Sequence, residues 1–320
     1  MLTFGEFCHE IRDNIADYIG MFYDIENVDI QEVTKNNGVL CTGLVVKRTD
    51  ANISPNIYLE GYYQKYLNGM EMEKVLTEIM KDYHMASIRI KESDKEILSY
   101  IQDSDYYYQN AFVRVVNYER NKDIAETCPV RKELDLMATL RLRINMSEDG
   151  LASSQITTKD ILRLDLDVNK LWNCAKENSR NFFPVQTATL YDLVNQMMPE
   201  EDILPMPGGE AYVITNSVGM NGAGAIMYAK ESIDEVAEAL GGNVIILPSS
   251  IHELILLKEE SMDMAKSLQQ MVKEINAAVV DDMDILSNSV YKFDRDTKEI
   301  TIAAKDPMIK EKTKDRELGE

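Results

Sequence analysis

Apolar residues recur at helical spacing at the start of the chain and alternate with polar residues in the segments that follow. The helical stripe consists of Phe4, Phe7, Cys8, Ile11, Ile15, Tyr18, Ile19 and Phe22. Its three- and four-residue steps predict an amphipathic helix that packs by one face. The segments VDIQEV and VLCTGLVVKR flank TKNNG, which predicts a β-hairpin because Asn and Gly tolerate a positive φ. A second helix is predicted at about residues 71–83.

The middle and the end of the chain mix strand patterns with helix patterns. A strand is predicted in AFVRVVNYERN, and a hairpin in LDLMATLRLRINM and LASSQITT with its turn at Asp149 and Gly150. The segment DVNKLWNCAKENSRNFFP predicts a helix that ends before Pro184. Beyond it we expect the strands AYVITN and NVIIL, the helix SIDEVAEALGG, a helix at about 260–276 and the hairpin VYKFDRDTKEITI. This order favours the α+β class, with mixed or antiparallel sheets, hairpins and packing helices.

A boundary is suggested by residues 197–210, which contain three of the eight prolines and a pair of glycines. Such a segment separates two subdomains or forms a long surface loop within one domain. We therefore predict an N-terminal α+β region at 1–196 and a C-terminal α/β region at 210–304. The charged segment 305–320 is expected to be a disordered tail.

Composition and charge restrict the class of protein. The 320 residues are 45% hydrophobic and 28% charged, which is typical of a globular chain. The formal net charge of −21 would repel nucleic-acid phosphates, and no dense run of Lys and Arg is interleaved with aromatic residues. Nucleic acid is therefore not an expected ligand, whereas a protein partner remains open.

Cysteine usage and hydropathy indicate the compartment. Cys8, Cys41, Cys128 and Cys174 lie far apart, without the short spacing of a zinc knuckle or a redox motif, so we expect buried free thiols in a reducing cytoplasm. The first residues lack the apolar region of a signal peptide, and no apolar stretch reaches the length of about 18 residues that suggests a membrane span. A cytoplasmic protein is expected.

The segment PSSIHE supplies the residue types of a hydrolase. Ser249 or Ser250 as nucleophile, His252 as base and Glu253 as the orienting acid are the candidates. Their spacing argues against this role, because neighbours on a strand point to opposite faces and working triads usually assemble from distant segments. A strand end followed by a half-buried strand is the alternative interpretation.

The other motifs for small ligands and metals are weak. The glycines of TNSVGMNGAGA match neither G-x-G-x-x-G nor G-x-x-x-x-G-K-[ST], so a structural turn is favoured over a nucleotide loop. The histidines His9, His84 and His252 are scattered, and the acidic segment VVDDMDILSN lacks the glycine and the glutamate of an EF-hand loop. We therefore expect neither a metal nor a cofactor.

Two tyrosine clusters are candidates for a partner surface, because tyrosine combines a large apolar ring with a polar tip. The first is GYYQKYLNG and the second is SDYYYQN. The candidate residues are Tyr62, Tyr63, Tyr106, Tyr107 and Tyr108. Packing in the core of a helical segment explains some of these rings without any function.

Several motifs occur together in an order that is similar to that of a known family. They are KNNGVLCTGL, ISPNIYLEGYYQKYLNG, VRVVNYERN, AKENSRNFFP, YVITN with NGAGAIMYA, and ILPSSIHELILL with LSNSVYKFDRDTKEI. With these motifs the chain resembles a bacterial family catalogued as domain of unknown function 5688, from about residue 4 to residue 303. The resemblance implies one full-length unit and a cytoplasmic location, and it carries no catalytic residues across.

Polar residues within these motifs mark a candidate ligand site. Asn216 and Asn221 lie at the end of an apolar strand, and Asn178 is taken to lie after a helix. If AYVITN and NVIIL lie side by side, their carboxyl ends bring 215–222 and 248–252 together, the usual location of a site in an open α/β sheet. The leading hypothesis is a non-catalytic binding, regulatory or accessory protein. The alternatives are a Ser/His hydrolase at 249–253 and an acidic mimic of nucleic acid.

Overall fold

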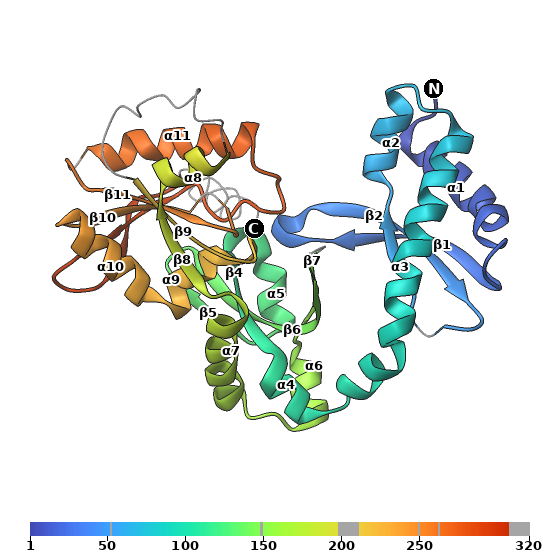
Figure 1. The fold of residues 1–320 in the computed structure, drawn as a ribbon, viewed down its shortest axis with the longest axis horizontal. Helices are drawn as coiled ribbons and strands as arrows, with labels where there is room; N and C mark the ends of the chain where they lie inside the picture. Colours follow the sequence, from blue (N-terminus) through green and yellow to red (C-terminus); the bar gives the residue numbers. More distant parts are fainter. Residues whose placement is uncertain (52, 148–149, 198–210, 249, 262, 307–320) are drawn as a thin grey trace, which may run out of the picture. The chain divides into compact units, whose positions relative to one another are not determined.

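The computed structural model describes residues 1–51, 53–147, 150–197, 211–248, 250–261 and 263–306, with the backbone alone at 89–98, 147 and 194–197. The chain forms two compact units, Met1–Asp103 (unit 1) and Ser104–Glu320 (unit 2). This division differs from the boundary expected at 197–210, a segment of which residues 198–210 lie outside the described residues. Helices combine with antiparallel sheets in both units, which confirms the α+β class (Figure 1).

Unit 1 packs helices on one face of a small sheet. Its elements are α1 (Phe4–Ile19), β1 (Ile25–Thr34), η1 (Asn36–Gly38), β2 (Leu40–Arg48), β3 (Asn56–Tyr58), α2 (Glu60–Leu67) and α3 (Met72–Tyr100). The sheet has the order β1-β2-β3, and β1 and β2 form the hairpin expected from the sequence. Asn37 at its turn has a φ of 62°, as the motif requires.

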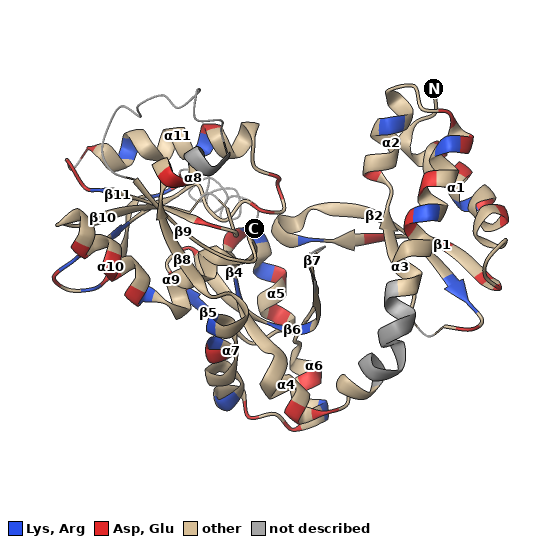
Figure 2. Cartoon of the chain, viewed as in Figure 1, with Lys and Arg blue, Asp and Glu red and all other residues tan. Residues whose placement is uncertain are grey.

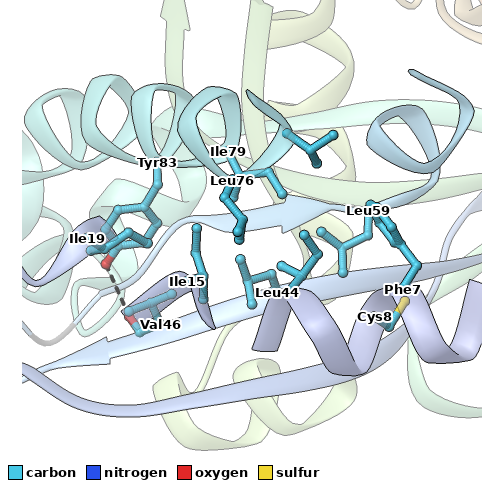
Figure 3. Close-up of a cluster of buried hydrophobic side chains, with 12 residues drawn as sticks. Phe7, Cys8, Ile15, Ile19, Leu44, Val46, Leu59, Leu76, Ile79 and Tyr83 are labelled. Atoms are coloured by element: carbon cyan, nitrogen blue, oxygen red, sulfur yellow. Dashed lines mark hydrogen bonds between the residues drawn. The ribbon is translucent and has the colours of Figure 1, made fainter. Parts of the chain in front are cut away.

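The core of unit 1 is built from the predicted stripes. Ile11 and Ile15 of α1 and Ile79 of α3 pack with Leu44 and Val46 of β2, and all five are fully buried (Figure 3). The hydroxyl of Tyr83 donates to the carbonyl of Val46 at 3.1 Å, so the one polar atom on that ring is also satisfied. Burying one of these Ile, Leu or Val side chains contributes about 1.5 to 3 kcal/mol. The apolar periodicity of the sequence therefore determines which helix faces pack on the sheet.

The first part of unit 2 is a four-stranded antiparallel sheet in which β6 pairs with three other strands. The strands are β4 (Ala111–Asn117), β5 (Val130–Glu133), β6 (Leu136–Ser147) and β7 (Gly150–Gln155). Helices accompany it: α4 (Ser104–Asn110), η2 (Glu119–Asn121), α5 (Lys122–Thr127), α6 (Thr158–Leu164) and α7 (Val168–Phe182). The predicted hairpin of β6 and β7 is present, with Gly150 at a φ of 141°.

The second part of unit 2 is a six-stranded antiparallel sheet with the order β13-β12-β10-β11-β9-β8. Its strands are β8 (Val185–Thr189), β9 (Ala211–Asn216), β10 (Val244–Leu247), β11 (Leu254–Lys258), β12 (Val290–Phe293) and β13 (Ile300–Ala304). The helices are α8 (Leu190–Met197), η4 (Gly222–Gly224), α9 (Ala225–Tyr228), α10 (Lys230–Leu240) and α11 (Met264–Ala278). Because β8 pairs with β9, this sheet includes a strand from the region expected to end at residue 196.

Candidate functional site

The two loops expected to form a site do meet, although by a different topology. Strands β9 and β10 are not neighbours, because β11 lies between them and pairs antiparallel with both. They therefore run parallel to each other, and their carboxyl ends lie at the same edge of the sheet. There the amide of Ala223 donates to the carbonyl of Ile251 at 3.2 Å, and the hydroxyl of Thr215 donates to the carbonyl of His252 at 3.4 Å.

His252 is held at both ring nitrogens. Its Nδ1 accepts a hydrogen bond from the backbone amide of Asn221 at 3.3 Å, and its Nε2 lies 3.2 Å from a carboxylate oxygen of Asp284. Because Nδ1 accepts this hydrogen bond, the proton of the neutral ring lies on Nε2, and Nε2 donates to Asp284. The ring therefore fastens the loop after β9 to the segment before β12.

The serine and glutamate candidates do not complete a catalytic triad with this ring. The hydroxyl of Ser250 is buried and accepts from the backbone amide of His252 at 2.9 Å, and no hydrogen bond joins that hydroxyl to the His252 ring. Glu253 forms no ion pair with any part of the chain that the structure describes. Ser249 lies outside the described residues. His252 and Glu253 precede β11, whereas the sequence suggested that the strand includes them.

The asparagine candidates stabilise the backbone. The side chain of Asn216 accepts from the amide of Val218 at 2.9 Å and donates to the carbonyl of Met220 at 2.7 Å, which closes the loop after β9. Asn221 has a φ of 58°, and its side-chain Nδ2 donates to the carbonyl of Val113 in β4 at 2.8 Å. Both residues position the loop that contacts His252.

Side chains form hydrogen bonds with the backbone groups of β4 on the edge that does not pair with β6. Asn178 of α7 donates to the carbonyl of Ala111 at 2.8 Å and to that of Tyr108 at 2.9 Å. The hydroxyl of Ser179 accepts from the amide of Val113 at 2.8 Å. Buried backbone groups need such partners, because an unpaired one costs about as much as a lost hydrogen bond. Asn178 thus has a structural explanation that sequence reasoning did not foresee.

Two arginines lie diagonally across the β4–β6 pair, and no carboxylate of the residues that the structure describes lies at ion-pair distance from either. Arg114 lies opposite Thr139, two positions along β6 from Arg141. Burial lowers the pKa of Arg114, an effect that the charge of Asp284 partly opposes. Burial and the neighbouring charge of Arg114 lower the pKa of Arg141 to about 10. Arg141 donates to the hydroxyl and the carbonyl of Ser153 at 2.9 and 2.8 Å, so neutral acceptors solvate it.

A buried carboxylate, Asp135, is a residue that sequence reasoning missed. It lies between β5 and β6 and accepts three hydrogen bonds, from Ser287 and Ser289 at 2.8 Å each and from Tyr291 at 2.6 Å. Burial, followed by the charge of Asp135, raises the pKa of Tyr291 well above its ordinary value. The motif LSNSVY, which supplies these donors, was the available signal for a polar network.

The tyrosine candidates of unit 1 make contacts within the unit. Tyr62 of α2 donates to Asp82 of α3, and burial followed by that hydrogen bond raises the pKa of Tyr62. Tyr63 donates to the carbonyl of Leu2 at 3.0 Å, and its ring lies 5.1 Å from that of Phe4. Both rings are half-buried, which leaves less surface for a partner than the sequence suggested.

The tyrosine candidates of unit 2 are also engaged. Tyr106 donates to the carbonyl of Arg143 at 3.0 Å, and the buried Tyr107 accepts from Arg163 at 3.3 Å. Tyr108 accepts from the amide of Asp167 at 2.9 Å. Each hydroxyl therefore fixes α4 against another segment, and the partner-surface role of these rings stays a prediction.

A small pocket of about 60 Å³ opens among β4, β5, β6, α7 and α9. Apolar side chains, including those of Val113, Ala138 and Met227, form part of its wall. The guanidinium of Arg131 lies over the ring of Trp172, 4.7 Å from its centroid, and both residues line the pocket. The sequence offered no signal for this pocket, because its lining comes from four separate segments.

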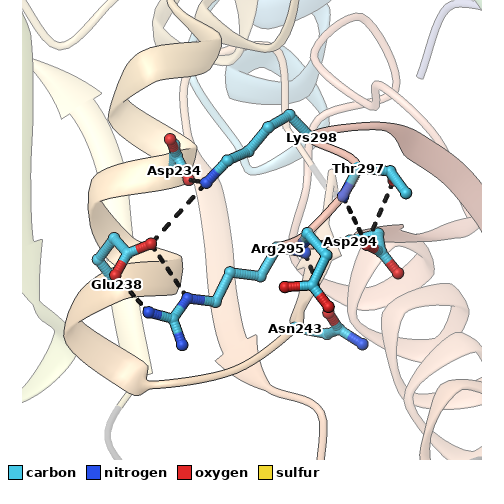
Figure 4. Close-up of polar contacts among 8 residues, drawn as sticks. Asp234, Glu238, Asn243, Asp294, Arg295, Thr297 and Lys298 are labelled. Carbon is cyan, nitrogen blue, oxygen red and sulfur yellow. Dashed lines mark hydrogen bonds and ion pairs between the residues drawn. The ribbon is translucent and has the colours of Figure 1, made fainter.

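The acidic residues of unit 2 are interspersed with basic ones (Figure 2). In one cluster, Arg295 and Lys298 from the β12–β13 turn contact Glu238 of α10 (Figure 4). The hydrogen bond from Arg295 lowers the pKa of Glu238. Carboxylates in this cluster are thus neutralised in pairs, unlike the open rows that a mimic of nucleic acid requires.

Membership of a family follows from comparison with known proteins. A model described as "Family of unknown function (DUF5688)" matches residues 4–295, most of the chain. The chain belongs to this family. No curated protein matches the chain, and no solved structure matches it.

The region matched by DUF5688 contains both units up to Arg295. Asp135, His252 and Asp284 all fall within it, as does the pocket beside Trp172. Within the parts of this DUF5688 protein that the structure describes, no group of three His, Cys, Asp or Glu side chains is placed to hold a metal ion. No described helix has both the length and the apolar character needed to cross a bilayer.

Proposed function

We propose that this chain is a cytoplasmic protein without a catalytic centre, which acts by binding in an accessory or regulatory role. The observation that carries the proposal is the pair of contacts made by His252. Its two ring nitrogens face the amide of Asn221 and the carboxylate of Asp284. A general base needs a free nitrogen within hydrogen-bond reach of the proton that it takes, and in this arrangement the imidazole has a structural task instead.

The pocket beside Trp172 supports the binding part of the proposal. Binding sites for small molecules are concave, are lined mostly by apolar side chains and contain a few placed polar groups. This pocket is small, about 60 Å³, and combines apolar side chains with the cationic side chains of Arg131 and Lys176. The hydrolase alternative lacks a comparable observation, since the Ser250 hydroxyl contacts a backbone amide.

Substitution of His252 tests the proposal. A structural role predicts that His252→Ala lowers the free energy of unfolding by about 1 to 3 kcal/mol, because it leaves a backbone amide and a carboxylate without their partner. His9, which is exposed on α1, provides the matched control, and His9→Ala should leave the melting temperature unchanged. An esterase or phosphatase activity of the native protein that His252→Ala abolishes without a change in melting temperature would contradict the proposal.

A pull-down from a bacterial lysate tests the binding role, with an unrelated protein of similar negative charge as the control. A stoichiometric partner, or a small molecule that co-purifies with the chain and not with the control, supports the proposal. Hydrolytic turnover that requires His252 would replace it with the hydrolase alternative.

A further inference from the structure

The outer edge of β1 in unit 1 presents backbone groups that point away from the sheet. Thr42 of β2 directs both of its groups away from β1, because its carbonyl accepts from the amide of Leu59 at 2.9 Å and its amide donates to Glu60 at 2.5 Å. Thr42 lies opposite Glu32 of β1, so the two residues form a pair without hydrogen bonds between them. The amide and the carbonyl of Glu32 therefore point outward as well.

The same geometry recurs along β1, because pairs without hydrogen bonds alternate with hydrogen-bonded pairs in an antiparallel ladder. Ile30 lies opposite Leu44 and Val28 lies opposite Val46, at two-residue steps from Glu32. Their backbone groups face the open edge, and the amide of Ile30 donates to the carboxylate of the preceding residue at 2.9 Å. No backbone hydrogen bond joins these β1 groups to another segment that the structure describes.

Strand β1 lacks the features that usually protect an edge strand, which are a short length, proline, lysine or a bulge. It has ten residues and contains neither proline nor lysine. Its one irregularity lies at the start, between Ile25 and Asn27. The edge of β4, by contrast, is sealed by the side chains of Asn178 and Ser179. The edge of β1 from Val28 onward is thus open to a further strand.

The core of unit 1 is incomplete at this edge. Val28 and Ile30 pack against the core but stay half-buried, whereas their neighbours on β2, Leu44 and Val46, are fully buried. Side chains on one face of a strand lie beside those of the next strand at alternate positions. A strand added outside β1 would therefore cover Val28 and Ile30 if its residues on that face were apolar.

The charge of β1 selects the sign of such a strand. It contains three acidic residues and no basic one. Glu26 is paired with Lys47 at 2.9 Å, whereas Asp29 and Glu32 are exposed and neither forms an ion pair with a residue that the structure describes. A second copy of β1 would place acidic residues beside acidic residues, which is destabilising. Lysine or arginine in the added strand would instead compensate these charges.

We propose that the outer edge of β1 binds an extended basic segment of a protein partner, which adds to the sheet as a fourth strand. Its apolar side chains would lie beside Val28 and Ile30, and its basic side chains, at the alternate positions, near Asp29. In this mode of recognition backbone hydrogen bonds supply affinity and the alternate side chains supply specificity. The inference rests on the proposed function, because it names the kind of partner that a binding protein takes.

A labelled peptide of alternating lysine and valine, about as long as β1, serves as the probe. The full chain is titrated into it and fluorescence anisotropy is measured. Valines beside Val28 and Ile30 would donate their amides to β1, because those residues form hydrogen-bonded pairs with the added strand. We expect saturable binding that N-methylation of the valine amides weakens at least about tenfold. N-methylation of the lysine amides should leave it unchanged, and a glutamate–valine peptide should bind at least about tenfold more weakly.

Variants of the chain locate the binding. Ile30→Pro removes one outward amide and leaves the ladder with β2 intact, because an edge strand tolerates proline where the lost N–H faces away from the sheet; it should weaken binding about tenfold or more. Asp29→Asn combined with Glu32→Gln removes both charges and should weaken binding about threefold or more. Glu73→Gln removes an exposed charge from α3 and should leave the affinity unchanged. Thermal unfolding verifies that each variant is folded, and the N-methylated peptides need no variant.

Three results would overturn the inference. The first is no saturable binding of the lysine–valine peptide, and the second is equal binding of the peptide with N-methylated valines, which would show charge attraction without strand pairing. The third is a dimer of the full chain that Ile30→Pro dissociates, which would show that the edge pairs with a second copy. The His252 experiment remains independent: a structural role for His252 with an inert edge would reject this partner class alone. Turnover that depends on His252 would reject the proposed function itself.

Discussion

The buried carboxylate Asp135 provides the sharpest test of the packing within unit 2. It is 5% exposed and accepts hydrogen bonds from the hydroxyls of Ser287, Ser289 and Tyr291, which are at most 1% exposed. These partners follow Asp135 by more than 150 residues in the sequence. The carboxylate therefore joins the β5–β6 turn to the start of β12.

Asp135→Ala removes the common acceptor and leaves three buried donors without it. A hydrogen bond to a charged group contributes about 1.5 to 3 kcal/mol, and a buried donor left unsatisfied costs about 1 to 3 kcal/mol. Because the three hydroxyls share one acceptor, their contributions do not add in full, and we expect a loss of about 3 to 5 kcal/mol in the free energy of unfolding. Tyr291→Phe removes one donor and should cost about 1.5 to 3 kcal/mol.

Urea unfolding followed by tryptophan fluorescence measures the effect, because Trp172 lies in unit 2 together with Asp135. Asp263→Ala is the matched control, since Asp263 is exposed and its side chain makes no cap hydrogen bond. The denaturant slope should stay constant across the series. A loss of less than about 1 kcal/mol for Asp135→Ala would show that the network contributes little and would refute this reasoning.

Three further outcomes are expected. Gly222→Ala should destabilise unit 2, because the added methyl would lie 2.2 Å from the carbonyl oxygen of His252; equal melting temperatures for both proteins would contradict this. Ser179→Ala should cost about 1 to 3 kcal/mol by leaving a β4 amide unpaired, as measured by urea unfolding, and an unchanged midpoint would argue against the edge contact. Hydrogen bonding from the Thr3 amide holds the pKa of Glu6 below its ordinary 4.5, so this carboxylate stabilises α1 above that pH and its contribution is lost as the pH falls through the lowered pKa. The difference in melting temperature between Glu6→Gln and the native protein should therefore shrink on acidification, and a constant difference would contradict this.

Much of the fold was predictable where one periodicity dominates. The stripe from Phe4 to Ile19 gave α1, and the Asn-Gly and Asp-Gly turns gave the hairpins β1–β2 and β6–β7. Short or amphiphilic elements were not predicted, among them β8 and α5. The helix α3 continues to Tyr100, well beyond the predicted end near residue 83, because the residues that follow are good helix formers without a helix-terminating Gly or Pro.

The sequence predicted where the candidate site lies, and it did not predict which residues contact one another there. Strand polarity placed the loops 215–222 and 248–252 together, and they are in contact. The acceptor for His252 is Asp284, which belongs to the acidic segment VVDDMDILSN that sequence reasoning considered as a candidate calcium loop. A pairing between segments more than thirty residues apart depends on the order of the strands, and residue types alone do not encode that order.

The side chains that seal the edge of β4 also bear on how unit 2 folds. The contact from Ser179 to Val113 spans 66 residues, and that from Asn221 spans 108. Non-local contacts of this kind slow folding, because a long loop must close before its contacts stabilise the chain. During synthesis β4 emerges long before α7 and the loop at Asn221, and until then its edge can pair with other strands. Unit 2 should therefore fold late and cooperatively, with an aggregation-prone interval that ends only when its C-terminal sheet has formed.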